Sequence, residues 1–368
     1  MILKKDCRFF SGDKPCHYHK ENGIKCDDCN YYQPISNKIL IIKLDAVGDV
    51  LRTTSILIPL KKKYPKSYIV WCTKFDSKEL FQKNSLVDEI IIADEDARFR
   101  LQAEDFDIII NLDTSKLSSS IAALASGKNK IGFVLDRKGF VEATSKEAEQ
   151  WLEMSAFDDV KKANQKSYQQ IMYEILELNL PVHKPVIHIS ESIKARVSRK
   201  SFFSRIKKDK PTIGLNVGVG PKWPSKGWPI KRWNELINQL NTSNFYLLLL
   251  GGPAENQTLT NLSEDKKYLI NSGSNNSLLE FAAIVDLCDI IVTADTLTLH
   301  IATALDKNIV ALFGPTSANE IELYGKGIKL IRTDECKCYY RNFCTEEISC
   351  MEKISSVSVV DAINSLLK

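Results

Sequence analysis

The chain reads Ile290-Ile-Val-Thr-Ala-Asp295-Thr-Leu-Thr-Leu-His300 and, shortly afterwards, Ile309-Val-Ala-Leu-Phe-Gly-Pro-Thr316. This order predicts a buried strand, a turn at Asp295, a helix that carries His300, and a second strand. The start of such a helix exposes unpaired backbone N–H groups and the positive end of the helix dipole, which suits a phosphate. Open α/β sheets bind ligands beyond the carboxyl ends of parallel strands. We therefore expect an α/β fold with an anion site here.

Length and composition restrict the class of protein. The chain has 368 residues, of which 44% are hydrophobic and 26% charged, so we expect a globular protein with two domains. The net charge is only +4, and the lysines are spread over the whole chain rather than concentrated in one stretch, which disfavours nucleic acid as a partner. The first residues become polar too soon for the apolar region of a signal peptide, and the longest apolar runs have the length of strands, too short to span a membrane. We expect a cytoplasmic protein that can also contact the inner face of the membrane.

Strand and helix patterns alternate through the first half of the chain. A buried strand at 38–44 is followed by a turn at 45–49 and a helix at 50–63. Further strands are predicted at 68–72, 89–93, 107–112 and 130–134, and helices near 77–82 and 118–125. Such alternation predicts βαβ units and a parallel sheet.

A second round follows a linker expected at 180–185 and a basic segment at 194–210. It predicts strands at 212–218, 245–250, 268–271 and 289–293, and helices at 229–240 and from 255 onward. We therefore predict two doubly wound, Rossmann-like domains facing across a cleft, at 37–190 and 191–352. Residues 1–36 form a cysteine-rich module, and an amphipathic helix within 353–368 is expected to pack back on the N-terminal domain.

Two places at strand ends carry candidate polar residues. Gly48 and Asp49 follow the first strand, where glycine permits close approach of a ligand and the carboxylate projects over the sheet edge. Asp49 would equally suit a helix N-terminus. Asp295 and Thr296 are good helix caps in their own right, and His300 fits a packed histidine as well as a ligand.

A second group of candidates follows the glycine loop at 218–220. Lys226 precedes the helix that starts near Pro229, where its charge would add to the dipole and hold a diphosphate; the alternative is an exposed lysine. Glu255, after Gly251-Gly-Pro, would accept hydrogen bonds from ribose hydroxyls. The alternative is a first-turn glutamate that interacts with the helix dipole.

Together these motifs resemble the family 9 glycosyltransferases, the ADP-heptose heptosyltransferases of bacterial lipopolysaccharide synthesis. The match covers about residues 38–368, and its motifs are Asp295-Thr-x-x-x-His300 with Phe313-Gly-Pro-Thr316, Gly48-Asp49-Val with Thr53-Thr54 and Pro59, Lys226-x-Trp-Pro, and Gly251-Gly-Pro-Ala-Glu255. The resemblance implies a GT-B fold and inverting, metal-independent transfer of a sugar, heptose by family, from an ADP-sugar to a lipopolysaccharide-core or other glycan acceptor. It assigns Asp49 as the catalytic base, Lys226 to the donor phosphates, Glu255 to the ribose and the 295–300 turn to the diphosphate.

The chain departs from the family at Leu297, where glycine is usual. A side chain there narrows the approach to the phosphates, whereas the backbone N–H groups remain. Two alternatives follow: a metal-stabilised binding or scaffold protein that lost turnover, and a nucleotide-sugar epimerase on the same fold. A nicotinamide-dependent oxidoreductase is disfavoured, because neither opening strand is followed by Gly-x-Gly-x-x-Gly.

Eight of the ten cysteines fall into two sets, one near each end of the chain. The N-terminal set, for which we predict structural zinc with iron as the alternative, is Cys7, Cys16, Cys26 and Cys29, beside His17 and His19. The second set, which would bind a second metal or complete the first site, is Cys336, Cys338, Cys344 and Cys350. Clustered cysteines in a reducing compartment favour metal over disulfides.

Overall fold

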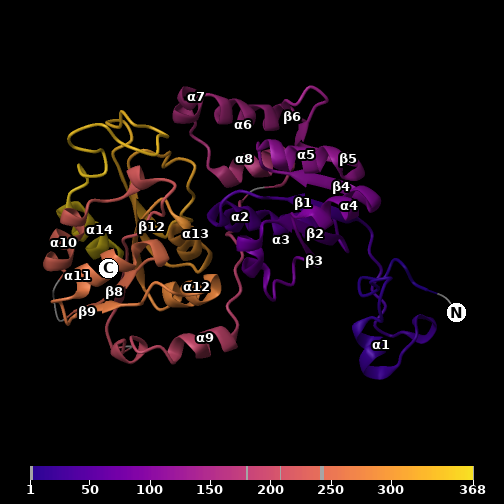
Figure 1. Cartoon of the computed structure of the whole chain (residues 1–368), viewed down its shortest axis with the longest axis horizontal. Helices are drawn as coiled ribbons and strands as arrows, with labels where there is room; N and C mark the ends of the chain where they lie inside the picture. Colours follow the sequence, from indigo (N-terminus) through magenta and orange to yellow (C-terminus); the bar gives the residue numbers. More distant parts are fainter. Residues whose placement is uncertain (1–2, 180, 208, 241–243, 368) are drawn as a thin grey trace.

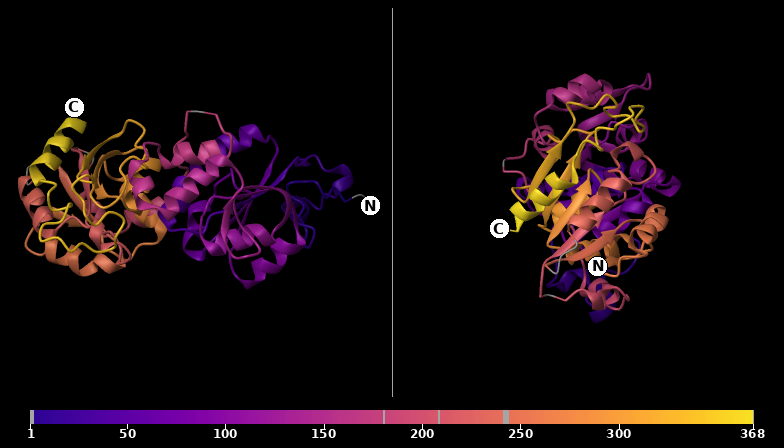
Figure 2. Two further views of the ribbon diagram at one scale, coloured as in Figure 1. Left: turned by 90° about the horizontal axis from the view of Figure 1, so that it is seen from above. Right: turned by 90° about the vertical axis from the view of Figure 1, so that its left-hand side faces the viewer.

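The computed structural model consists of two α/β units and a small N-terminal module (Figure 1). It describes residues 3–179, 181–207, 209–240 and 244–367. Parts of four predicted segments lie outside these ranges: positions 1–2 of the module, 180 of the linker, 208 of the basic segment and 368 at the C-terminus. Figure 2 shows the first unit (purple) between the module and the second unit (orange and yellow).

The first unit is built on a six-stranded sheet. Its strands are β1 (Lys38–Ile42), β2 (Tyr68–Thr73), β3 (Glu89–Ile92), β4 (Asp105–Asn111), β5 (Ser126–Leu135) and β6 (Val141–Ala143). Their order is β3-β2-β1-β4-β5-β6, and only β6 runs antiparallel to its neighbour. Ile39 and Ile41 of β1 enter one apolar cluster, whereas Leu40 and Ile42 enter another on the opposite face. Both faces of this sheet are therefore covered, as expected for a doubly wound sheet.

The helices of the first unit include one interruption that the sequence did not predict. They are α2 (Val47–Thr53), α3 (Leu57–Lys63), α4 (Glu95–Ala103), α5 (Lys116–Leu124), α6 (Lys146–Ala156), α7 (Asp158–Ala163) and α8 (Tyr168–Ile175), with 3₁₀ turns η2 (Thr54–Ile56) and η3 (Phe75–Phe81). The helix predicted over 50–63 is broken at η2 because Pro59 cannot donate to the carbonyl of Ser55. The Tyr173 hydroxyl donates to that carbonyl instead, at 3.0 Å.

The second unit repeats the same strand order. Its strands are β7 (Thr212–Asn216), β8 (Tyr246–Leu250), β9 (Leu269–Asn271), β10 (Ile290–Ala294), β11 (Asn308–Phe313) and β12 (Gly327–Ile331), all parallel in the order β12-β11-β10-β7-β8-β9. Its helices are α9 (Glu191–Ser198), α10 (Ile230–Gln239), α11 (Asn256–Ser263), α12 (Leu278–Asp286), α13 (Leu297–Ala304) and α14 (Ser356–Leu366), with 3₁₀ turns η4 (Phe203–Arg205), η5 (Pro224–Lys226) and η6 (Pro253–Glu255). None of the helices in the described ranges is long and apolar enough to cross a membrane.

The position expected for the last helix was wrong. α14 does not return to the first unit but packs on α10, β11 and β12 of its own unit. Val359 and Ile363 are buried in one apolar cluster with Trp233 and Leu236 of α10, and Gln239 donates to the Ser356 hydroxyl at 3.0 Å. α14 therefore buries its apolar residues against α10 and the adjacent face of the second sheet.

The N-terminal module lies at the end of the first unit away from the second (Figure 1). It contains α1 (His17–Asn22) and the 3₁₀ turn η1 (Cys26–Asp28). Arg8 joins the module to the first unit, because its guanidinium pairs with Asp88 and donates to the carbonyl of Ser67 at 2.8 Å.

Candidate active site

A cleft with a volume of about 580 Å³ lies between the two units. It opens at the carboxyl ends of β1, β7 and β10, where both sheets reverse their strand order, which is the expected ligand position in such sheets. It is lined by every predicted site residue outside the cysteine sets: Gly48, Asp49, Lys226, Glu255, Asp295, Thr296, Leu297 and His300. Folding therefore gathers in one place residues that lie in opposite halves of the chain.

Gly48 marks the closest approach of α2 to α13 of the other unit. A β-carbon on Gly48 would lie 2.8 Å from Cδ2 of His300 and 3.5 Å from the Cα atom of Leu297. The first distance is shorter than real Cβ contacts, so a larger residue would push the two helices apart. The sequence suggested that Gly48 permits close approach of a ligand, whereas in the structure it permits close packing of α2 against α13.

Asp49 lies in the first turn of α2, and its side chain is 31% exposed. One of its carboxylate oxygens lies 2.7 Å from the guanidinium of Arg52, one helical turn later. Arg52 stacks at 3.9 Å from the ring centroid of Tyr168, whose hydroxyl lies 2.6 Å from that of Thr53. The carboxylate is thus held from one side and remains open to the cleft, as a base acting on a hydroxyl requires.

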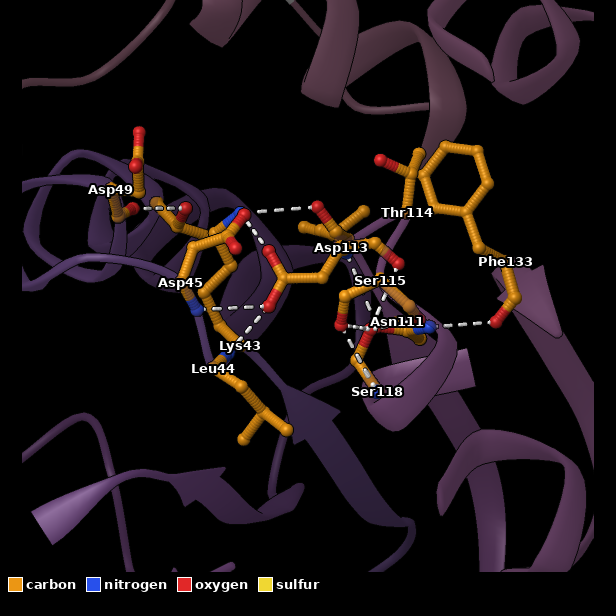
Figure 3. Close-up of polar contacts among 12 residues, drawn as sticks. Lys43, Leu44, Asp45, Asp49, Asn111, Asp113, Thr114, Ser115, Ser118 and Phe133 are labelled. Carbon is orange, nitrogen blue, oxygen red and sulfur yellow. Dashed lines mark hydrogen bonds and ion pairs between the residues drawn. The ribbon is translucent and has the colours of Figure 1, made fainter. Parts of the chain in front are cut away.

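A buried ion pair supports the loop that precedes Asp49. Lys43 pairs with Asp113 and lies 3.3 Å from Asp45, while Asp113 also accepts from the backbone N–H groups of Leu44 and Asp45 (Figure 3). Burial alone would lower the pKa of Lys43, but the two carboxylates hold it well above its usual value. This network ties the end of β1 to the end of β4 and fixes the path of the 43–49 loop.

Lys226 and Asp295 form the opposite wall of the cleft. The Lys226 ammonium lies 3.0 Å from the Asp295 carboxylate and donates to the Asp295 carbonyl at 3.1 Å. Burial alone would raise the pKa of Asp295, but Lys226 and His300 hold it far below its usual value. Asp295 is therefore ionised and holds Lys226 at the start of α13.

The first turn of α13 has no side-chain cap. The Thr296 hydroxyl instead contacts Asn216 at 3.2 Å and Thr293 at 3.0 Å. Burial lowers the pKa of His300 to about 4, and the charge of Arg52 acts in the same direction, so His300 is neutral at neutral pH. Lys226, which is paired with Asp295, and the uncapped N-terminus of α13 are the groups at this end of the cleft that suit an anion.

Glu255 lies where the second glycine loop meets η6. Its carboxylate accepts from the backbone of Gly252 at 2.9 Å and of Gly220 at 3.3 Å. A β-carbon on Gly218 would lie 2.6 Å from the Glu255 carboxyl carbon, so this glycine is needed for the side chain to fit. Glu255 holds two loops together and also lines the cleft.

Sequence reasoning missed several further cleft residues, among them Arg52, Lys161, Glu320 and Tyr340. Glu320 is buried and accepts from the Tyr340 hydroxyl at 3.0 Å, and burial raises its pKa. The Lys161 ammonium lies 4.0 Å from the centre of the Tyr340 ring. Only Arg52 had a sequence signal, because its position three residues after Asp49 puts both on one face of a helix.

The cysteines nearest this cleft are those of the C-terminal set. The sulfur atoms of Cys336, Cys338 and Cys350 all lie within 4.8 Å of one another and are buried. The thiol of half-buried Cys344 interacts with that of Cys338. Buried thiols at this spacing could hold a metal ion.

The N-terminal set does not form the expected site. Its four cysteines line one small pocket, but among the described residues no three of their sulfur atoms come within that distance of one another. Aromatic rings pack beside the thiols instead: Tyr18 stacks on Tyr31 at 3.9 Å and meets Phe9 edge-on at 5.0 Å. The thiols that the structure gathers for a metal are therefore those near the C-terminus.

Comparisons with known proteins identify the family of this chain. The model of glycosyltransferase family 9 (heptosyltransferase) matches residues 97–349. Lipopolysaccharide heptosyltransferase 2 of Salmonella typhimurium is 28% identical over 304 residues, which cover 76% of this chain and 83% of that protein.

Solved structures share the fold. The family 9 glycosyl transferase of Veillonella parvula superposes with a TM-score of 0.73 at 21% identity, covering 90% of this chain and 97% of that chain. For ADP-heptose lipopolysaccharide heptosyltransferase II of E. coli the TM-score is 0.65 at 22% identity, with 90% and 98% covered. The iron-containing dodecameric glycosyltransferase TibC of enterotoxigenic E. coli gives 0.56 at 10% identity, with 90% and 79% covered.

Two six-stranded sheets, parallel except for β6, with a cleft between them define a two-domain protein of GT-B architecture. The chain belongs to glycosyltransferase family 9.

Proposed function

We propose that this protein is an inverting heptosyltransferase that transfers heptose from ADP-heptose to a sugar of a lipopolysaccharide core. The observation that carries the proposal is the position of Asp49 and Lys226 on opposite sides of one cleft, from different units. The Salmonella relative and the E. coli structure are heptosyltransferases of lipopolysaccharide, and the latter is named for ADP-heptose. An acceptor of this kind would bring the protein to the inner face of the membrane.

In the proposed reaction, Asp49 takes the proton of an acceptor hydroxyl as its oxygen attacks the anomeric carbon of the donor. The new carbon–oxygen bond forms on the face opposite the nucleotide, and the bond to the ADP oxygen breaks with its electron pair. Lys226 and the uncapped start of α13 stabilise the charge that develops on the departing diphosphate. Because these groups already supply positive charge, we propose that the chemistry needs no metal.

Leu297 does not remove the features on which this mechanism depends. It lies at the first position of α13 and lines the cleft, beside a helix start that has no side-chain cap. We propose that it shapes the donor site and leaves turnover intact, against the alternative of an inactive scaffold.

The experiment that tests the function is Asp49→Asn in the full chain, assayed with ADP-heptose and a lipopolysaccharide-core acceptor. We expect the transfer rate to fall at least about 10²-fold, as for loss of a general base, with ADP affinity changed less than about twofold. Asp76→Asn is the matched control, because Asp76 is an exposed carboxylate of the same unit outside the cleft. An unchanged rate would remove Asp49 from catalysis, and no transfer by the unmodified chain would favour the scaffold.

We also infer that Cys336, Cys338 and Cys350 hold a metal ion, with Cys344 as a fourth ligand. Support comes from the burial of the triad and from the 3.4 Å separation of the Cys336 and Cys338 sulfurs. Four thiolates suit zinc or iron. TibC is iron-containing, although at 10% identity its likeness concerns the fold alone.

A further inference from the structure

The C-terminal cysteines lie on the loop between β12 and α14, and this loop contacts the cleft at three points. The first is the end of β11. A β-carbon on Gly314 would lie 2.7 Å from the Cys350 sulfur and 2.7 Å from the Met351 sulfur. The cysteine cluster therefore packs directly behind the 313–316 turn, whose Thr316 lines the cleft.

The second contact reaches the turn that carries Lys226. The backbone N–H of Ser225 donates to the carbonyl of Asn342 at 3.1 Å, and the Ser225 hydroxyl donates to the carbonyl of Arg341 at 2.6 Å. Both acceptors lie between Cys338 and Cys344. The segment 339–342 thus holds η5 by two hydrogen bonds, one residue before the lysine that pairs with Asp295.

The third contact is Tyr340, on the same segment. Its backbone N–H donates to the carbonyl of Pro315 at 2.8 Å, and its hydroxyl donates to Glu320. Its ring meets that of Trp223 edge-on at 6.3 Å. One short segment between Cys338 and Cys344 therefore contributes Tyr340 to the cleft and contacts or supports three further cleft residues: Trp223, Lys226 and Glu320.

We propose that a thiophilic metal ion bound by Cys336, Cys338, Cys344 and Cys350 fixes the 339–342 segment, and that this segment positions Lys226 for the donor diphosphate. The cysteines are thus positioning residues for nucleotide binding, although none of them lines the cleft. This inference rests on the donor role proposed for Lys226. Since the ion and the nucleotide favour the same loop conformation, each strengthens the binding of the other by the same factor.

The test compares zinc-loaded and chelator-treated full chain in reducing buffer. Calorimetric titration with ADP measures nucleotide affinity, and hydrogen exchange measures the protection of residues 222–228. We expect metal removal to weaken ADP binding about 5- to 50-fold and to speed exchange in that segment, in the range usual for coupled sites. Because metal removal also affects the rest of the loop, Ser225→Ala provides a variant that keeps every thiol.

Ser225→Ala removes the hydrogen bond from the Ser225 hydroxyl and leaves the one from its backbone N–H. We expect this variant to keep its zinc and to bind ADP more weakly than the unmodified chain. Removal of zinc should then reduce its ADP affinity by a smaller factor than in the unmodified chain. Ser198→Ala is the matched control, because its exposed hydroxyl bonds only within α9. Equal ADP affinity with and without zinc, or unchanged exchange at 222–228, would overturn the coupling while leaving the transferase intact. Failure of the chain to bind either zinc or iron also overturns it. If neither the zinc-loaded nor the chelator-treated chain binds ADP, the proposed donor site is refuted. Hydrogen exchange at 222–228 then still shows whether the metal orders the segment that carries Lys226.

Discussion

The two cysteine sets look alike in sequence and differ in three dimensions. Each contributes four thiols, and the N-terminal set has the spacing more typical of zinc. Yet the C-terminal triad is buried and gathered behind the cleft, whereas the N-terminal thiols stay half-buried around stacked aromatic rings. The packing around each set therefore decides whether its thiols converge. The C-terminal loop packs against β11 and α14, whereas the described residues of the module form no comparable apolar core.

The largest difference is expected on replacing thiols. The double change Cys336→Ser and Cys350→Ser should abolish metal binding and cost about 4 kcal/mol of stability, the size seen for loss of a metal site. That loss corresponds to a midpoint about 8–16 °C lower, measured by thermal unfolding alongside metal analysis.

The matched change in the other set is Cys26→Ser with Cys29→Ser. We expect it to leave ADP affinity unchanged and to lower the unfolding midpoint by less than about 4 °C. Metal analysis of both double variants would contradict this expectation if bound metal were lost on replacing Cys26 and Cys29 and kept on replacing Cys336 and Cys350.

A second contrast sets His300 of the cleft against His17 of the module, whose side chain is 67% exposed. The folded-state pKa of His300 is about 4 against an ordinary 6.5, so between these values the unfolded chain binds a proton that the folded chain does not. The contribution of His300 to stability should therefore be constant above about pH 6.5 and decline by up to about 3 kcal/mol as pH falls to 4.

His300→Gln should flatten that part of the pH profile, measured by urea unfolding, and His17→Gln should leave it unchanged. Equal slopes for the two variants would show that His300 does not set the acid sensitivity.

A further effect, on the rate of metal release, is expected for Gly314→Ala. The added carbon would crowd Cys350 and Met351, which costs about 1–3 kcal/mol in a packed site. Zinc should dissociate faster, as measured with a chromogenic chelator. Gly23→Ala in the module is the comparison: its φ of +67° strains alanine, but no atom lies within 4 Å of the added carbon. It should lower stability without changing zinc release.

Sequence reasoning recovered most of the fold and half of the cleft. Buried strands were predictable because continuous apolar runs ending at glycine or aspartate carry a strong signal, as at β1 and β10. The edge strand β6 and helices α4 and α6 to α8 were missed. β6 has three residues, too few to show periodicity, and α4 is polar with no clear apolar face. α6 and α8 do bury apolar residues at helical spacing, so their pattern was available in the sequence and was overlooked. Glu320 and Tyr340 were missed for another reason: their relevance arises only when their loops fold over α7 and α8, and no local pattern marks that contact.

By itself, the sequence determined the two alternating α/β halves, the family motifs and the residues of the second unit that line the cleft, because each depends on local periodicity or on fixed spacing along the chain. The tertiary structure alone decided that Gly48 receives His300 of the other unit, that α14 stays on its own sheet and that the C-terminal thiols, rather than the N-terminal ones, converge. These outcomes depend on which surfaces remain to be buried after the sheets have formed, and that competition is settled by packing between segments far apart in the chain.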